Sequence, residues 1–173
     1  MKKTTNLVWG GRFEYDSSNL LKRINNSISF DYNLANEDIK LNKSYAKSLF
    51  DAKILSLNEL KKITVALDDI QQEIQKERFK FSDDYEDIHM NIEMALKKRV
   101  GRLAGKLHTG KSRNDQVATD VKLWTKEKIK NVIKKIIKIQ KTIIRKSESN
   151  LNVIMPGFTH SQNAQPILYA HYL

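Results

Sequence analysis

Apolar residues recur every three or four positions through most of the chain, the spacing that places them on one face of an α-helix. The pattern predicts a helix over 31–54. A second helix begins at a capping box of Ser56 and Glu59, in which each side chain binds a backbone N–H left unpaired by the first turn. A third helix is predicted over 84–99, with Gly101 placed to end it.

The longest predicted helix begins near Asn114 and continues to about Ser149. Its apolar stripe comprises Val117, Val121, Trp124, Ile129, Val132, Ile136, Ile139 or Gln140, and Ile143. A helix on the order of 50 Å long, at 1.5 Å per residue, indicates a large helical bundle. We therefore predict an all-α fold, with a small N-terminal helical domain over 1–111 and the beginning of a central bundle over 112–173.

The two ends of the chain have weaker patterns. The first fifteen residues have no clear period and suggest an extended arm. Near the other end, 153–155 is predicted as a short extended piece, Pro156 and Gly157 as a turn, and Pro166 as part of the first turn of a helix. Because the sequence stops at Leu173 inside an apolar pattern, we expect a truncated chain that lacks most of the bundle.

Composition limits the class of protein. The 173 residues are 40% hydrophobic and 29% charged, as in a folded domain, and no apolar run is long enough for a membrane span or a signal peptide. A cytoplasmic location without a membrane partner is the resulting expectation. Without any cysteine, the chain has no disulfide, no thiolate metal site and no cysteine nucleophile.

The net charge of +11 raises nucleic-acid binding as a hypothesis. The excess of lysine is spread over the whole chain, however, and its densest run falls on the polar face of the long helix. We interpret this run as a solvated surface, with a polyanion-binding face as the alternative. Its members are Lys126, Lys128, Lys130, Lys134, Lys135, Lys138 and Lys141.

The segment GKLHTGKS at 105–112 satisfies the G-x-x-x-x-G-K-[ST] pattern of a phosphate-binding loop. Such a loop follows a buried strand, whereas the residues upstream have helical spacing, so we do not predict a nucleotide site. The basic residues Lys106, Lys111 and Arg113 beside a helix N-terminus still favour an anion, and a carboxylate fits as well as a phosphate. The alternative is a solvated turn capped by Asn114 or Asp115.

Five blocks of sequence, in order, resemble the argininosuccinate lyases of the fumarase/aspartase superfamily. They are WGGRF, NNSISFDYNLANEDI, EDIHMNIE, HTGKSRNDQVATD and MPGFTHSQNAQP, and they extend from about residue 9 to the end. The arginine in SRND and the preceding HTG favour this family over fumarase, aspartase or adenylosuccinate lyase. The resemblance implies the last step of arginine biosynthesis, which is related to the urea cycle: the elimination of fumarate from argininosuccinate, leaving arginine.

The resemblance also implies the site residues. Removing a proton beside a carboxylate builds negative charge on that carboxylate, which fixed donors stabilise, and a general acid assists the departing guanidino group. His160 matches the acid/base residue of the family, and Thr159 matches the neighbouring residue that binds a carboxylate. The alternative is that this pair only forms a turn. Positions matching substrate-binding residues are Ser27, Asp31, His89, Ser112, Arg113, Asn114 and Gln165. Asp31 would complement the cationic end of the substrate. The alternative for His89 is a partly exposed histidine on a helix that has no functional role.

One departure from the family is expected to matter. Its catalytic base is a serine on a mobile loop far downstream, and its sites are shared between subunits of a homotetramer, so we expect little activity from this chain alone. No cofactor or metal site is predicted, because His108 and His171 have no partner at metal-ligand spacing. The alternatives are a non-catalytic helical assembly protein, a basic polyanion-binding protein, or an adenylosuccinate lyase-like or fumarase-like enzyme.

Overall fold

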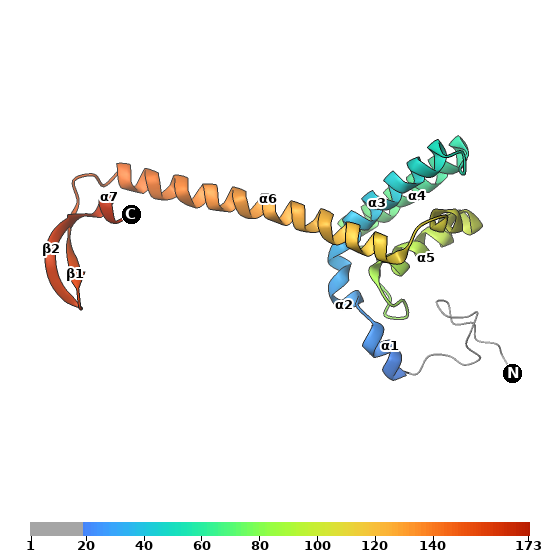
Figure 1. Ribbon diagram of the computed structural model, residues 1–173, viewed down its shortest axis with the longest axis horizontal. Helices are drawn as coiled ribbons and strands as arrows, with labels where there is room; N and C mark the ends of the chain where they lie inside the picture. The colour runs from blue at the N-terminus through green and yellow to red at the C-terminus, as the bar shows by residue number, and fades with distance from the viewer. Residues whose placement is uncertain (1–18) are drawn as a thin grey trace. The chain divides into compact units, whose positions relative to one another are not determined.

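The computed structural model describes residues 19–173 (Figure 1). The arm predicted for the first fifteen residues lies outside the described part of the chain. The chain divides into two compact units, Met1–Trp124 and Thr125–Leu173, and the division falls within the longest helix, α6 (Arg113–Glu148). The domain boundary that we place between residues 111 and 112 stays a prediction.

The described part of the first unit is helical. The helix predicted over 31–54 is present, but it is preceded by two short turns of helix and ends slightly earlier. The elements before α6 are α1 (Asn19–Asn25), α2 (Ile28–Asp31), η1 (Tyr32–Leu34), α3 (Ala35–Asp51), α4 (Leu57–Gln75), α5 (Ile88–Val100) and the 3-10 segment η2 (Gly101–His108).

The ends of α4 and α5 follow the signals in the sequence. Ser56 Oγ accepts from the Glu59 amide at 3.3 Å, while the Ser56 amide donates to Glu59 Oε2 at 2.8 Å, which confirms the capping box. Helix α5 begins at Ile88, four residues after the predicted start at 84, where the side chain of Asp87 caps it by accepting from the Met90 amide at 2.7 Å. Gly101 ends this helix as predicted, with a φ of +62° that an L side chain rarely adopts.

The core of the first unit lies between α3, α4 and α5, of which α3 and α4 run side by side in Figure 1. Apolar residues that recur at helical spacing on each helix meet there and lose all or nearly all contact with solvent. The largest of them are Ile39, Ile63, Leu67, Ile70, Ile88, Ile92 and Leu96. Their burial is the main favourable contribution to the stability of this unit.

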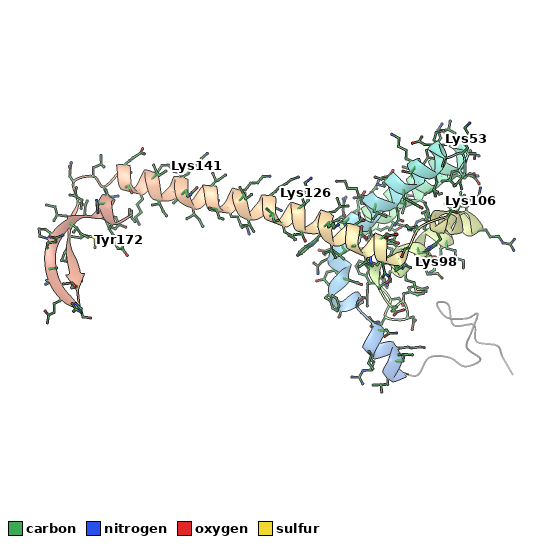
Figure 2. The ribbon with its side chains drawn as sticks, viewed as in Figure 1. Lys53, Lys98, Lys106, Lys126, Lys141 and Tyr172 are labelled. Atoms are coloured by element: carbon green, nitrogen blue, oxygen red, sulfur yellow. The ribbon has the colours of Figure 1, made fainter. Side chains whose placement is uncertain are left out.

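Helix α6 begins one residue before the predicted start. Ser112 Oγ accepts from the Asn114 amide at 3.2 Å, so Ser112 caps the helix in place of Asn114 or Asp115. Beyond Trp124 its apolar side chains are exposed, and its lysines, including Lys126 and Lys141 in Figure 2, extend into solvent. None of the described helices is both long enough and apolar enough to cross a membrane.

The fold is not purely all-α, because the segment after α6 forms an antiparallel hairpin of β1 (Ile154–Thr159) and β2 (Gln162–Leu168), followed by a short α7 (Tyr169–Tyr172). The predicted turn at Pro156 and Gly157 is wrong, since these residues lie in β1, opposite and beside Pro166 in β2. The helix start predicted at Pro166 is wrong as well. A proline is tolerated in an edge strand, and both strands of a two-stranded sheet are edges.

Candidate functional site

The segment that satisfies the phosphate-loop pattern lacks the context of such a loop. Residues 101–108 form the 3-10 segment η2, which follows α5, and between residues 19 and 153 the structure contains no strand. Gly110 has a φ of +70°, and the Thr109 carbonyl accepts from the Tyr45 hydroxyl at 2.6 Å. The glycine therefore serves a tight turn that is attached to α3 and enters α6.

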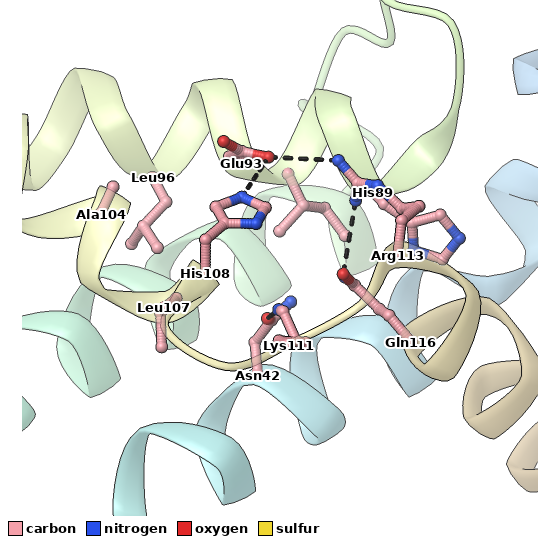
Figure 3. Close-up of a pocket in the computed structure, with 11 residues that line it drawn as sticks. Asn42, His89, Glu93, Leu96, Ala104, Leu107, His108, Lys111, Arg113 and Gln116 are labelled. Carbon is pink, nitrogen blue, oxygen red and sulfur yellow. Dashed lines mark hydrogen bonds and ion pairs between the residues drawn. The ribbon is translucent and has the colours of Figure 1, made fainter. Parts of the chain in front are cut away.

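The basic side chains on either side of this turn are paired with other side chains at the surface of the protein. Arg113 donates to Glu93 at 3.2 Å and to Gln116 at 3.4 Å, and His108 Nε2 lies 2.9 Å from the same Glu93 oxygen (Figure 3). Burial raises the pKa of Glu93, but His108 and Arg113 outweigh it and hold the pKa below its ordinary value. The small pocket among these groups has about 20 Å³ of space, enough for one water molecule.

A buried polar cluster, here called the Asp38 cluster, joins three elements of the first unit. Asp38 Oδ1 accepts from Gln116 Nε2 and lies 2.8 Å from His89 Nδ1, and Asp38 Oδ2 accepts from Asn42 Nδ2 at 2.9 Å. Helix α3 supplies Asp38, α5 supplies His89 and α6 supplies Gln116. The complete cluster is Asp38, Asn42, His89, Lys111, Gln116 and Asp120.

The two aspartates of the cluster differ in their surroundings. Both are 0% exposed, but no described residue donates a hydrogen bond to either carboxylate oxygen of Asp120, although His89 Nδ1 lies 3.4 Å from Oδ2. Burial and the neighbouring charge of Asp38 raise the pKa of Asp120 to about 9. Burial also acts to raise the pKa of Asp38, but its contacts with His89 and Gln116 outweigh that effect and lower it.

Asp38, His89 and Asp120 have ligand atoms within 4.8 Å of one another, which is close enough to hold a metal ion. Their existing contacts argue against that use. Both Asp38 oxygens already accept hydrogen bonds, and the contact of His89 Nδ1 with Asp38 needs a proton where a metal would need a lone pair. Lys111, whose ammonium group donates to Asn42 at 2.9 Å, already supplies a positive charge to the cluster.

A larger open pocket, here called the Ser27 pocket, lies beside the cluster and has a volume of about 510 Å³. Its lining residues are Ser27, Phe30, Asp31, Asn33, Leu34, Asp87, His89, Val117, Val121 and Trp124. Small-molecule sites commonly have this size and this mixture of apolar walls with a few polar groups. Three of the residues predicted to bind substrate, Ser27, Asp31 and His89, therefore meet around one pocket.

Asp31 is held in place by two donors. The Ser27 hydroxyl donates to its Oδ2 at 2.6 Å, and the Ile88 amide donates to its Oδ1 at 3.2 Å. Burial raises the pKa of Asp31 above its ordinary value, while these two hydrogen bonds counteract the rise. The pocket thus contains a largely buried carboxyl group with a fixed orientation, a suitable partner for a cationic ligand group.

The remaining predicted residues lie elsewhere. Ser112 and Asn114 are exposed at the start of α6 and, like Arg113, do not line the Ser27 pocket. Thr159, His160 and Gln165 are exposed on the hairpin of the second unit, in which His160 and Ser161 form the turn. Both turn residues have positive φ, 49° and 61°, as in a two-residue hairpin turn of type I′.

The Asp38 cluster was not predicted, although the sequence contains a signal for it. Polar residues occur four positions apart on an inward face in two helices, Asp38 with Asn42 in α3 and Gln116 with Asp120 in α6. A buried polar pair at this spacing needs partners on another element. Which element supplies them depends on the tertiary packing, which the pattern of one helix does not specify.

Comparison with known proteins assigns the chain to a family. A sequence model of the family described as Lyase matches residues 11–173. The chain belongs to this lyase family. Its predicted resemblance to argininosuccinate lyases is confirmed by relatives of that name.

The relatives are longer than this chain. The argininosuccinate lyase of Ehrlichia ruminantium (strain Welgevonden) is 49% identical over 169 residues, which are 98% of this chain and 37% of the relative. That of Limosilactobacillus reuteri subsp. reuteri (strain JCM 1112) is 46% identical over 166 residues, or 96% of this chain and 36% of the relative. The lyase-family chain therefore spans little more than a third of the length of these relatives.

A solved structure supports the fold. An EDDS lyase variant with bound fumarate matches 82% of this chain and 27% of its own, with a TM-score of 0.66 and 23% sequence identity. At this level of identity, the likeness concerns the fold alone. The helical arrangement of this lyase-family chain is thus one that a solved lyase also adopts.

Proposed function

We propose that this chain belongs to an argininosuccinate lyase, which eliminates fumarate from argininosuccinate and releases arginine in the last step of arginine biosynthesis. The observation that carries the proposal is the Ser27 pocket, around which Ser27, Asp31 and His89 meet. The names and identities of the relatives support the same substrate.

The Ser27 pocket suits the cationic end of that substrate. Asp31 is 9% exposed and accepts from both Ser27 and the Ile88 amide, so its carboxyl group is fixed before a ligand arrives. Asp87 lines the same pocket and adds a second carboxylate. A guanidinium group presents several N–H donors in one plane, which matches acceptors that are held in fixed positions.

The remaining predicted residues would bind the carboxylate groups at the anionic end of the substrate. Ser112, Arg113 and Asn114 lie at the N-terminus of α6, where backbone N–H groups favour carboxylates. Thr159 and Gln165 would bind carboxylate groups from the hairpin, and His160 would act as the acid toward the leaving guanidino group. In the proposed enzyme, the sites are shared within a cytoplasmic homotetramer, and the reaction uses no cofactor.

Binding to the Ser27 pocket is testable on this chain. Arginine, the product that carries the guanidinium group, should bind the wild-type chain, as measured by isothermal titration calorimetry. Asp31→Asn removes the charge but keeps the shape, and it should weaken binding by about tenfold to a hundredfold, because a hydrogen bond to a charged group contributes about 1.5–3 kcal/mol. Asp69→Asn, on the exposed surface of α4, is the matched control.

The reaction is tested on the longer protein that contains this chain, by following the ultraviolet absorbance of fumarate. Argininosuccinate should yield fumarate, whereas adenylosuccinate and malate should not. Fumarate from adenylosuccinate or malate but not from argininosuccinate would overturn the substrate assignment. Equal arginine affinity of wild type and Asp31→Asn would instead remove the Ser27 pocket from the proposal.

A further inference from the structure

His89 joins the Ser27 pocket to the Asp38 cluster, and the residue is only 3% exposed. We propose that Asp38 is a positioning residue for His89: its carboxylate holds the proton on Nδ1 and thereby makes Nε2 the ring nitrogen that a ligand in the Ser27 pocket meets. The assignment of a ligand to that pocket rests on the proposed function, whereas the position of the proton does not.

The contact between the two side chains fixes where the proton lies. Nδ1 of His89 is 2.8 Å from Oδ1 of Asp38, and both residues are buried. An ionised carboxylate only accepts hydrogen bonds, so a contact of this length requires a proton on Nδ1. In a neutral imidazole the other nitrogen, Nε2, then has a free lone pair.

The groups around Asp38 favour its ionised form. Gln116 and Asn42 each donate to it through an amide nitrogen, and the ammonium group of Lys111 is bound to the Asn42 oxygen within the same cluster. Together with His89, these three groups surround the carboxylate with donors or positive charge. A buried carboxylate with several donors is stabilised in its charged form.

Asp120 completes the arrangement by having no such donors. No described residue donates a hydrogen bond to its two oxygens, and the Asp38 carboxylate lies within hydrogen-bonding reach as an acceptor. Two neighbouring buried carboxyl groups do not both ionise readily, so one proton stays with the pair. The absence of donors places that proton on Asp120, which leaves Asp38 as the acceptor for His89.

The lone pair on Nε2 has a chemical consequence for the Ser27 pocket. Asp31, Asp87 and His89 would then present only acceptors to the ligand, and a guanidinium group has only donors. The opposite tautomer would direct an N–H toward the guanidinium donors and oppose binding. Asp38 therefore acts on ligand affinity without touching the ligand.

The tautomer can be read directly by NMR of the ¹⁵N-labelled chain without ligand. Long-range ¹H–¹⁵N correlation distinguishes protonated from unprotonated ring nitrogens, and loss of one signal set in His89→Asn assigns His89 among the four histidines. The wild type should show a protonated Nδ1 and an unprotonated Nε2. A wild-type His89 with its proton on Nε2, with both nitrogens protonated, or with both unprotonated because a metal is bound, overturns the proposal without any variant.

Two matched variants separate positioning from a general loss of structure. Asp38→Ala removes the acceptor and should shift the proton to Nε2, whereas Asp120→Asn keeps the Asp38 contact and should leave it on Nδ1. With arginine as the ligand, Asp38→Ala should lose about tenfold in affinity, the equivalent of one hydrogen bond. If Asp38→Ala folds and keeps the wild-type tautomer, the positioning role of Asp38 is wrong. If the wild type has the expected tautomer but does not bind arginine, only the proposed function of the Ser27 pocket fails.

Discussion

At the scale of single residues, the clearest feature is that two buried aspartates of one cluster have opposite properties. Asp38 accepts three hydrogen bonds or close contacts from His89, Gln116 and Asn42, whereas no described residue donates a hydrogen bond to Asp120. Identical side chains at equal burial thus have pKa values displaced in opposite directions. The difference arises from the donors that surround each group, since burial alone would raise both.

The raised pKa of Asp120 predicts a pH dependence of stability. Between its unfolded pKa, about 4, and its folded pKa of about 9, the unfolded chain releases a proton that the folded chain retains. The free energy of unfolding should therefore fall as pH rises through this window. Asp120→Asn, which mimics the protonated group, should flatten the fall, so that its free energy of unfolding exceeds that of wild type by a margin that grows from pH 5 to pH 8.

Urea unfolding followed by circular dichroism between pH 5 and pH 8.5 measures this effect. Asp69→Asn makes the same chemical change at an exposed position of α4 and should follow the wild-type profile. Asp38→Asn should instead destabilise the chain at pH 7, because it removes the charge that the surrounding donors stabilise. A parallel pH profile for wild type and Asp120→Asn would show that Asp120 is ionised in the folded protein.

At the scale of elements, the start of α4 offers a direct test of a local signal. Ser56→Ala removes one half of the capping box and leaves the Glu59 amide without its acceptor. We expect a loss of about 1 kcal/mol in the free energy of unfolding. Ser44→Ala is the matched control, because Ser44 is exposed inside α3 and its hydroxyl donates only to the Lys40 carbonyl. Equal stability of the two variants would mean that α4 does not depend on its cap.

The helices could be predicted from the sequence because their signals are local. Capping residues such as Ser56, a terminating glycine such as Gly101 and apolar spacing all act within one or two turns. The hairpin could not be predicted in the same way, because Pro156 and Gly157 are typical turn residues. In the structure they lie in β1, beside a bulge. A Cβ on Gly157 would approach the Gln165 carbonyl to 2.9 Å, so close approach of the second strand explains this glycine. That contact joins two strands, and the spacing of residues along one strand does not reveal it.

In the candidate site, too, some residues could be predicted from the sequence and others could not. Resemblance to a family indicated Ser27, Asp31 and His89, and the structure brings them together around one pocket. It did not indicate Asp38 or Asp120, whose importance comes from packing α3 and α6 against α5. These carboxyl groups are unusual because they are buried where three helices meet. The pattern of polar and apolar residues along one helix shows which of its own residues are buried, but not which residues of other helices they contact.

At the scale of the whole molecule, the most prominent feature is the exposed apolar stripe on α6 within the second unit. The stripe consists of Ile129, Val132, Ile136, Ile139 and Ile143, which are between 37% and 60% exposed. Their spacing alternates between three and four residues, which is the heptad spacing of helices that pack along each other. An apolar stripe of this length is unfavourable in water and favours association with another apolar surface.

We therefore expect the chain to associate with itself as its concentration rises. Sedimentation velocity over a range of concentrations should show a mass above that of one chain, because pairing of the stripe removes its isoleucines from water. Ile136→Lys places a charge at the centre of the stripe and should shift the population toward single chains. Asn131→Lys adds the same charge on the same helix but away from the stripe, so it should associate like wild type. If both variants dissociate alike, net charge controls association; if neither does, the stripe is not the contact surface.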